Sequence, residues 1–322
     1  MGERALVTGA SGFVGGHVVR TLREHGYRVT ASGRRAEALP AGAVHVGDLD
    51  DLAHADVPAD VVVHCAALSS PWGRWADFEH ANVTGTRKVL EYARRVGARR
   101  LVHVSSPGIY AAPRDRLDIR EDQVDPSRPM NHYIRSKTQA ESLLRAAAAD
   151  PRNPEVVVLR PRGVVGAGDT GLVPRLLRVH ARVGVPVLDG GRGLVDLTAV
   201  ENVAHAVRLA AEVPGAAGLA FNVTNDDPRP FVELLDQLLT GLGLPLRHRH
   251  LPARLVYGVA GVLEAVCAVL PGHPEPPVTR YTVSTITHSQ TLDVSRARRV
   301  LGYEPLVSLD DALASYASVQ RG

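Results

Sequence analysis

Short apolar runs alternate with longer amphipathic segments through the first half of the chain. The runs at residues 4–8, 27–32, 43–46, 61–64, 100–104 and 155–159 predict β-strands. The segments at residues 12–25, 75–96 and 132–148 predict helices, and Val14, Val18 and Leu22 share one face of the first. Strands that alternate with helices indicate βαβ units, so we expect a parallel sheet with helices on both faces.

The second half has a looser pattern, in which glycine and proline become frequent after residue 161. An apolar run at residues 218–223 predicts one more strand, which returns to the sheet. Residues 230–240 and 309–319 predict helices of a smaller C-terminal lobe. The proline-rich residues 271–277 predict a rigid loop.

Residues 255–270 are apolar except for Glu264. The segment is shorter than the roughly 20 residues that a membrane-spanning helix needs. We expect a buried or pocket-lining helix here, and contact with a membrane surface is the alternative.

Composition narrows the class of protein. Hydrophobic residues make up 45% of the 322, enough for a large core, so disorder is not expected. The net charge of +3 comes without a basic run interleaved with aromatics, which argues against nucleic-acid binding. Cys65 and Cys267 lie in apolar stretches and are expected to be reduced core residues of a cytoplasmic protein. Because the first predicted strand begins so early, no signal peptide is expected.

A glycine-rich turn follows the first predicted strand. Gly9, Gly12 and Gly15 allow a tight turn, a close approach of pyrophosphate to the backbone, and close packing of helix on strand. The N-terminus of the next helix offers free N–H groups to phosphates. We therefore expect a dinucleotide here, contacted also by Ser11, Phe13 and Val14. A plain strand-to-helix turn is the alternative.

The end of the second strand indicates which nicotinamide cofactor binds. An NAD site usually places a carboxylate there for the ribose 2′-hydroxyl. This chain has no acidic residue between His25 and Ala36, and has Arg34 and Arg35 instead. Arginine pairs well with a 2′-phosphate, so NADP is favoured over NAD. Two solvated surface arginines are the alternative.

Tyr133 and Lys137 are the strongest catalytic candidates. Their i to i+4 spacing in a predicted helix places phenol and ammonium on one face. A neighbouring ammonium favours the phenolate form, so the tyrosine could exchange a proton near working pH. The lysine has further donors for a cofactor ribose.

Polar residues at other strand ends add to this pair. Ser105 or Ser106 follows the fifth strand, where a hydroxyl can orient a substrate carbonyl. Asn82 either satisfies backbone groups or holds a relay water. Asp48 either caps a turn or touches the adenine amine, and the small Ala66 and Ala67 would let a cofactor pack closely. His248 and His250 alternate on a predicted strand, but no carboxylate or cysteine completes a metal site.

In combination these residues resemble the extended short-chain dehydrogenase/reductase superfamily over essentially the whole chain. The matching motifs are the glycine turn, Gly47-Asp48-Leu49, His64-Cys65-Ala66-Ala67, Asn82-Val83-Thr84-Gly85-Thr86, Ser105-Ser106, Tyr133 with Lys137, Leu159-Arg160-Pro161, and Asp196 with Asn202-Val203. The resemblance implies a Rossmann-type, doubly wound α/β domain at residues 1–162, its sheet completed by parts of residues 194–224. Residues 163–322 would mainly form the substrate-binding lobe. It also implies that Ser106 is the catalytic serine, that Asp48 and Leu49 belong to the cofactor site, and that Pro161 lies near the nicotinamide.

Departures from the superfamily pattern narrow the substrate. Nucleotide-sugar members usually carry Asn where this chain has Gly163, and often Arg where it has Val195. Their loss argues against sugar-nucleotide chemistry. The Ser-Ser-Pro turn and the apolar residues 255–270 look more like the 3β-hydroxysteroid dehydrogenase branch, which includes 2-alkyl-3-oxoalkanoate reductases.

The sequence thus predicts hydride transfer between NADP(H) and a ketone or secondary alcohol on an apolar small molecule. Trp72 and Trp75 either wall its pocket or pack in the core. A nucleotide-sugar epimerase or dehydratase is the first rival, and a non-catalytic nucleotide-sensing regulator the second. The substrate, the direction and the oligomeric state stay open, a homodimer included.

Overall fold

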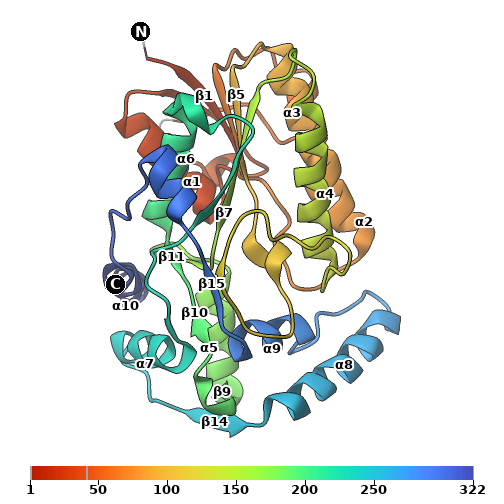
Figure 1. Ribbon diagram of the computed structural model, residues 1–322, viewed down its shortest axis with the longest axis vertical. Coiled ribbons are helices and arrows are strands. Elements are labelled where there is room, and N and C mark those ends of the chain that lie inside the picture. Colours follow the sequence, from red (N-terminus) through yellow and green to blue (C-terminus); the bar gives the residue numbers. More distant parts are fainter. Residues whose placement is uncertain (1, 41–42, 322) are drawn as a thin grey trace.

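The computed structural model describes residues 2–40 and 43–321, and a parallel sheet lies at its centre (Figure 1). Within these residues its seven strands are, in spatial order, β12 (Ala220–Val223), β7 (Glu155–Pro161), β5 (Arg100–Val104), β4 (Val61–His64), β1 (Arg4–Thr8), β2 (Arg28–Ser32) and β3 (Val44–His45). Every neighbouring pair is parallel. The predicted doubly wound α/β class is confirmed.

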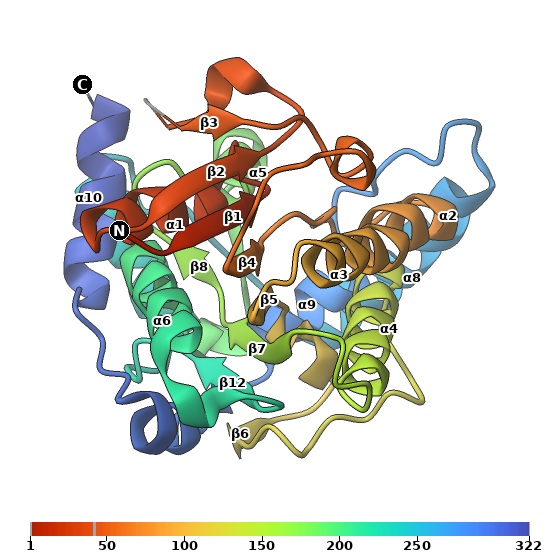
Figure 2. The same ribbon diagram turned by 90° about the horizontal axis from the view of Figure 1, so that it is seen from above.

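Helices cover both faces of this sheet, as Figure 2 shows. Val7 packs against α1 (Phe13–Glu24) and α6 (Val200–Glu212), while its neighbour Leu6 packs toward α3 (Gly85–Arg95) and α4 (His132–Ala147). Because successive side chains of a strand point to opposite faces, a strand covered on both sides needs an unbroken apolar run. That requirement explains why the sequence pattern placed the inner strands within two residues of their observed bounds, whereas the edge strand β3 is exposed.

One predicted helix, at residues 75–96, is more complex than its sequence pattern indicates. It comprises α2 (Trp75–Phe78), a π-helical segment η3 (Glu79–Thr84) and α3. A π-helical segment inserts an extra residue into the turn and is common at functional sites. Here the segment carries Asn82.

The remaining strands form small sheets below the large one. The strand order β13–β10–β15–β6 joins Arg229–Pro230, Leu194–Val195, Gln290–Leu292 and Arg116–Ile119. Two further pairs are β11 (Thr198–Ala199) with β8 (Val164–Val165), and β14 (His248–Leu251) with β9 (Val185–Leu188). The helices here are α5 (Leu172–Val183), α7 (Phe231–Gly241), α8 (Ala253–Val269), α9 (Arg280–Thr287) and α10 (Leu309–Arg321). Short helical turns lie at η1 (Ala36–Ala38), η2 (Asp51–Ala53), η4 (Pro107–Tyr110), η5 (Asp189–Gly191), η6 (Pro214–Ala216) and η7 (Ala297–Leu301).

The chain passes between the large sheet and the small sheets more than once. The predicted return strand is confirmed as β12, which pairs with β7, and α6 packs on α1. In the other direction β6, from the first half of the chain, pairs with β15. The boundary at residue 162 stays a prediction.

Helix α8 differs from the expectation of a buried helix. Its inward face consists of small residues seven apart, Ala253, Ala260 and Cys267. Its outward face is exposed and carries Leu255, Val259, Val262, Val266 and Val269. The small residues let α8 lie close to α9 and leave the branched side chains on the opposite side. Among the described residues no helix combines the length and apolarity needed to cross a membrane, and contact with a membrane surface stays a prediction.

A buried ion pair connects α4 to the large sheet. Arg160 on β7 donates from Nε and Nη2 to the two carboxylate oxygens of Glu141 on α4, at 3.0 and 2.5 Å. Its Nη1 donates to the Tyr110 hydroxyl and to the Glu121 carbonyl. Ser105 donates to the same carboxylate at 2.5 Å. The side chains of Arg160, Glu141, Tyr110 and Ser105 are buried, so the charges of the pair are compensated inside the protein, and the Tyr110 hydroxyl in turn donates to Asn222 Oδ1 at 2.9 Å.

Glu141→Gln tests this connection. The change keeps the shape of the side chain but leaves the Arg160 charge without a counter-charge, so we expect a loss of about 3–5 kcal/mol in unfolding free energy. Urea denaturation measures it. Glu212→Gln is the control, because Arg208 and Glu212 form an ion pair nearer the surface, within one helix, and we expect a loss of about 1 kcal/mol or less. Equal losses of unfolding free energy in the two variants would show that the buried pair stabilises the fold no more than the pair nearer the surface.

Candidate active site

The glycine turn between β1 and α1 leaves no room for side chains. Gly9 has φ +68°, and a Cβ there would lie 2.7 Å from the Ala66 backbone nitrogen. A Cβ on Gly15 would lie 2.2 Å from the Gly9 carbonyl oxygen. Gly12 precedes α1 without a side-chain cap, and the first turn holds no acidic residue. The first N–H groups of α1 are therefore open to an anion, which fits the predicted dinucleotide.

The predicted 2′-phosphate residues lie beside this turn. A Cβ on Gly33, at the end of β2, would lie 2.8 Å from Ser11 Oγ, so the strand end and the glycine turn are in contact. Arg34 and Arg35 follow directly and are exposed. Neither forms an ion pair with any described residue, so both guanidinium groups are available to an anion.

The other predicted cofactor residues line the same edge of the sheet. Asp48 Oδ1 accepts hydrogen bonds from the Asp50 and Asp51 backbone nitrogens at 2.8 and 3.4 Å, so it caps a turn, and its contact with adenine stays a prediction. Leu49 packs against Gly85. The rest of the predicted set occupies the turn itself or strand ends: Phe13, Val14, Ala66, Ala67 and Pro161.

Lys137 is a buried ammonium at the sheet edge. Asn131 caps α4 by accepting from the Ile134 nitrogen at 2.8 Å, which fixes the turn that carries Tyr133. One full turn further, Lys137 Nζ donates to the Val104 carbonyl at 2.9 Å. Burial lowers the pKa of Lys137 to about 8. Its remaining N–H donors fit the predicted contact with a cofactor ribose.

Tyr133 lies among hydroxyl groups. Burial raises the pKa of its phenol above the ordinary value, while hydrogen bonds with Ser106 and Ser69 lower it and Tyr281 raises it. The sequence indicated that Lys137 would lower the pKa of this phenol. In this structure the hydroxyls of Ser106 and Ser69 lower it instead. The phenol is therefore protonated at neutral pH and can donate a proton.

The two serines after β5 have different environments. Ser106 caps η4, accepting from the Gly108 nitrogen at 3.1 Å, and reaches Tyr133. Ser105 points to Glu141 in the core. The structure thus places Ser106, and not Ser105, beside the tyrosine.

Asn82 holds the loop that follows β4. Its Oδ1 accepts from the Leu68 nitrogen at 2.7 Å, and its Nδ2 donates to the Leu68 carbonyl and to Ser136 Oγ at 3.0 and 2.8 Å. These bonds join the π-helical segment, the loop and α4. They describe a positioning residue that sets where Ser69 lies, and a relay water stays a prediction.

Sequence reasoning missed Ser69 and Tyr281, which both act on Tyr133. Ser69 is one polar residue in a loop, and Tyr281 lies far from the motifs in the chain. Trp72, an expected pocket wall, donates from Nε1 to the His273 carbonyl at 3.2 Å and so joins this loop to the segment between α8 and α9. Trp75 instead packs under Arg135, whose guanidinium carbon lies 4.0 Å from the ring centre.

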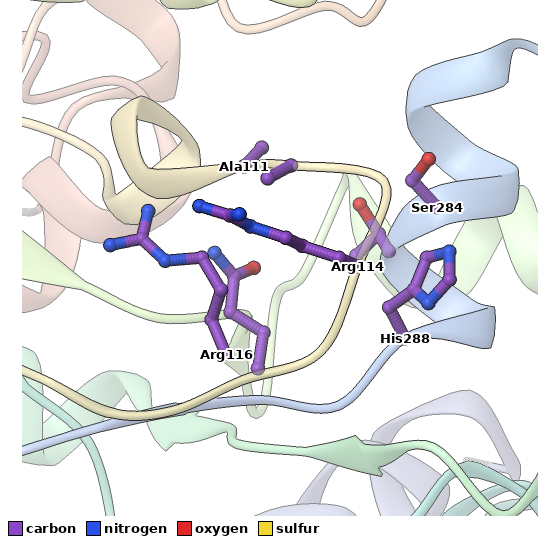
Figure 3. Close-up of a pocket in the computed structure, with 8 residues that line it drawn as sticks. Ala111, Arg114, Arg116, Ser284 and His288 are labelled. Carbon is purple, nitrogen blue, oxygen red and sulfur yellow. The ribbon is translucent and has the colours of Figure 1, made fainter. Parts of the chain in front are cut away.

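A separate small hollow lies beside α9. Figure 3 shows Arg114 and Arg116 on one side of it and Ser284 and His288 on the other. It includes none of the predicted catalytic or cofactor residues. No cluster of three or more side chains that could hold a metal ion occurs in the described part of the chain, around His248 and His250 or elsewhere. Both cysteines are free thiols.

Comparison with known proteins agrees with this geometry. The model of the NAD dependent epimerase/dehydratase family matches residues 5–224, more than half of the chain. The chain belongs to this family. A 2-alkyl-3-oxoalkanoate reductase of Stenotrophomonas maltophilia is 32% identical over 96% of this chain and 97% of the relative. The human sterol-4-alpha-carboxylate 3-dehydrogenase, decarboxylating, is 32% identical over 97% and 86%.

Solved structures extend the likeness. MoeE5 in complex with UDP-glucose and NAD is 28% identical, with a TM-score of 0.77 over 99% of this chain and 98% of that one. This member of the epimerase/dehydratase family is therefore an NAD(P)-dependent enzyme of the extended short-chain dehydrogenase/reductase superfamily, in its 3β-hydroxysteroid dehydrogenase-like branch.

The burial of Lys137 predicts a pH dependence of stability. Its pKa is about 8 in the folded chain, against the ordinary 10.5. Between these values the unfolded chain binds more protons, so stability should rise with pH. From about pH 7.5 to about pH 9.5 we expect cofactor-free protein to gain roughly 2 kcal/mol relative to Lys137→Met in urea denaturation. Lys88→Met, which removes the only other lysine, should follow the unmodified protein, and parallel profiles for all three would contradict the burial argument.

Proposed function

We propose that this protein catalyses NADP(H)-dependent interconversion of a ketone and a secondary alcohol on an apolar substrate. The observation that carries the proposal is the cluster of Ser106, Tyr133 and Lys137 at the carboxyl edge of the sheet, beside the glycine turn. Ligands of open parallel sheets bind at this edge.

The residues of the cofactor site fit a dinucleotide. The glycine turn and the N-terminus of α1 would hold the pyrophosphate, and Lys137 the ribose. Arg34 and Arg35 supply unpaired positive charge where NADP carries its 2′-phosphate, and this favours NADP over NAD. When bound, the nicotinamide supplies or accepts the hydride.

The protein side of the reaction is proton transfer. Ser106 donates a hydrogen bond that orients the substrate carbonyl, and the Tyr133 phenol gives its proton to the same oxygen. Because burial keeps this phenol protonated, the resting site is prepared for ketone reduction. Lys137, once it contacts ribose, adds positive charge that stabilises the phenolate left behind.

Two positions support an apolar substrate over a sugar nucleotide. Gly163 has φ +45°, and a Cβ there would lie 2.4 Å from Leu197 Cδ2, so the asparagine of nucleotide-sugar enzymes would require the Leu197 side chain to move. Val195 is buried in an apolar cluster. The names of the relatives, a 3-oxoalkanoate reductase and a sterol carboxylate dehydrogenase, point to steroid-like or 3-oxoacyl substrates. The likeness to MoeE5 keeps nucleotide-sugar chemistry as the rival to test.

Cofactor preference tests the arginine assignment. We expect NADPH to bind at least about tenfold more tightly than NADH, because Arg34 pairs with the 2′-phosphate. Arg34→Ala should remove most of this preference in a fluorescence titration. Arg87→Ala, which removes an exposed arginine of α3, should leave it unchanged. Equal dissociation constants for the two cofactors in the unmodified protein would contradict the assignment.

Tyr133→Phe tests the reaction. The change keeps the ring and its packing, so fold and NADPH affinity should survive, while turnover of an apolar ketone falls about 10²–10⁴-fold. NADPH oxidation is followed over a panel of steroid, 3-oxoacyl and aryl ketones. Near-full activity in the folded variant would remove Tyr133 from the mechanism. Micromolar binding of a UDP-sugar without binding of apolar ligands would favour the epimerase rival.

A further inference from the structure

Arg162 is a buried arginine whose charge lacks a partner. It follows β7 and is 5% exposed. Its Nε and Nη2 are enclosed and find no hydrogen-bond acceptor among the described residues. Arg160, two residues earlier, is equally buried but donates to Glu141, Tyr110 and Glu121. An enclosed guanidinium without acceptors is costly, so a fold that keeps one calls for an explanation.

One carboxylate acts on this charge without forming an ion pair with it. Asp196 attracts Arg162, yet no ion pair joins the two in the described structure. Asp196 Oδ2 accepts from the Leu292 nitrogen at 3.2 Å, and a hydrogen bond with Thr224 also stabilises the charged form of this carboxyl. Burial also raises the pKa of Asp196 to about 6, so this carboxyl is still largely ionised at neutral pH but loses its charge in mildly acidic solution.

Tyr281 connects Arg162 to the catalytic residues. A Cβ on Gly108 would lie 3.4 Å from the Tyr281 hydroxyl and 3.2 Å from Ser106 Oγ, so both hydroxyls flank the same glycine. Tyr281 acts electrostatically on Tyr133 on one side and on Arg162 on the other. The Tyr281 hydroxyl thus lies beside Ser106 and acts on both Tyr133 and Arg162, which brings the unpaired guanidinium close to the catalytic residues.

We infer that Arg162 binds a carboxylate of the substrate, close to the reacting carbonyl and assisted by the Tyr281 hydroxyl. The ligand class is a ketone or secondary alcohol that carries an acid group a few bonds away, as a 3-oxo or 3-hydroxy acid does. Arginine suits this task because its planar fork matches a carboxylate with two parallel hydrogen bonds. Arg162 is then a specificity residue, and this inference rests on the proposed ketone–alcohol chemistry.

Paired substrates test the inference. A long-chain 3-oxo acid and its methyl ester share the ketone and the apolar chain and differ only in the charge. For unmodified enzyme with NADPH we expect kcat/KM to favour the acid by about 10²-fold. Arg162→Met should lose the preference for the acid, because its KM for the acid rises while its rate on the ester is unchanged. Arg162→Lys should recover part of the preference. Arg178→Met, which removes an exposed arginine of α5, is the control.

Stability and binding separate this inference from its alternatives. Arg162→Met should unfold at equal or higher urea concentration, because it removes an unpaired buried charge, whereas a structural role predicts a loss. Calorimetry of the protein–NADP complex with the 3-hydroxy acid and its ester gives a readout that needs no turnover. Equal affinity for acid and ester, or a loss in Arg162→Met that is the same for both, would overturn the inference. Acid-selective binding without turnover would instead count against the proposed reaction.

Discussion

The catalytic geometry depends on the buried pair of Arg160 and Glu141. Glu141 lies one turn beyond Lys137 on α4, and Arg160 is part of the strand that ends at Pro161. Their two hydrogen bonds therefore fix how far α4 slides along the sheet. Ser105 also donates to Glu141, which holds the end of β5 in place. Its neighbour Ser106 is thereby positioned beside Tyr133. One ion pair thus aligns a helix and two strand ends, each of which contributes a part of the site.

The buried charged side chains of this molecule fall into two groups, those with hydrogen-bonded partners and those without. Away from the site the charge is compensated: Arg100, although buried, donates to Glu155 and to the carbonyls at the end of α6. At the site it is not. Lys137 donates to one backbone carbonyl, and Nε and Nη2 of Arg162 have no acceptor among the described residues. A buried charge without a counter-charge lowers the stability of the fold. Lys137 and Arg162 both lie at one edge of the sheet, and such a grouping is typical of a site that binds charged ligands.

The strands of the large sheet could be predicted from the sequence to within two residues, because strands that are buried on both faces must be apolar throughout. The sequence also indicated the glycine turn and the Tyr133–Lys137 pair, because each is local in the chain. Among the strands of the small sheets it indicated only β14, at His248 and His250, because the others, two to four residues long, carry too little pattern. The exposed face of α8 was not predicted, because its valines suit burial equally well. Ser69, Tyr281 and Arg162 also stayed hidden. Each has meaning only through residues that the fold brings from elsewhere.

The scarcity of lysine has a practical consequence. The chain holds only Lys88, ion-paired with Asp50 at the surface, and Lys137 within the site. Isotopic labelling of lysine side chains would therefore produce a spectrum with two ε-amine signals in two very different environments. One would report the solvent and the other the catalytic edge of the sheet. Magnetic resonance could then follow the protonation of the site in the unaltered protein, with its own surface lysine as the internal reference.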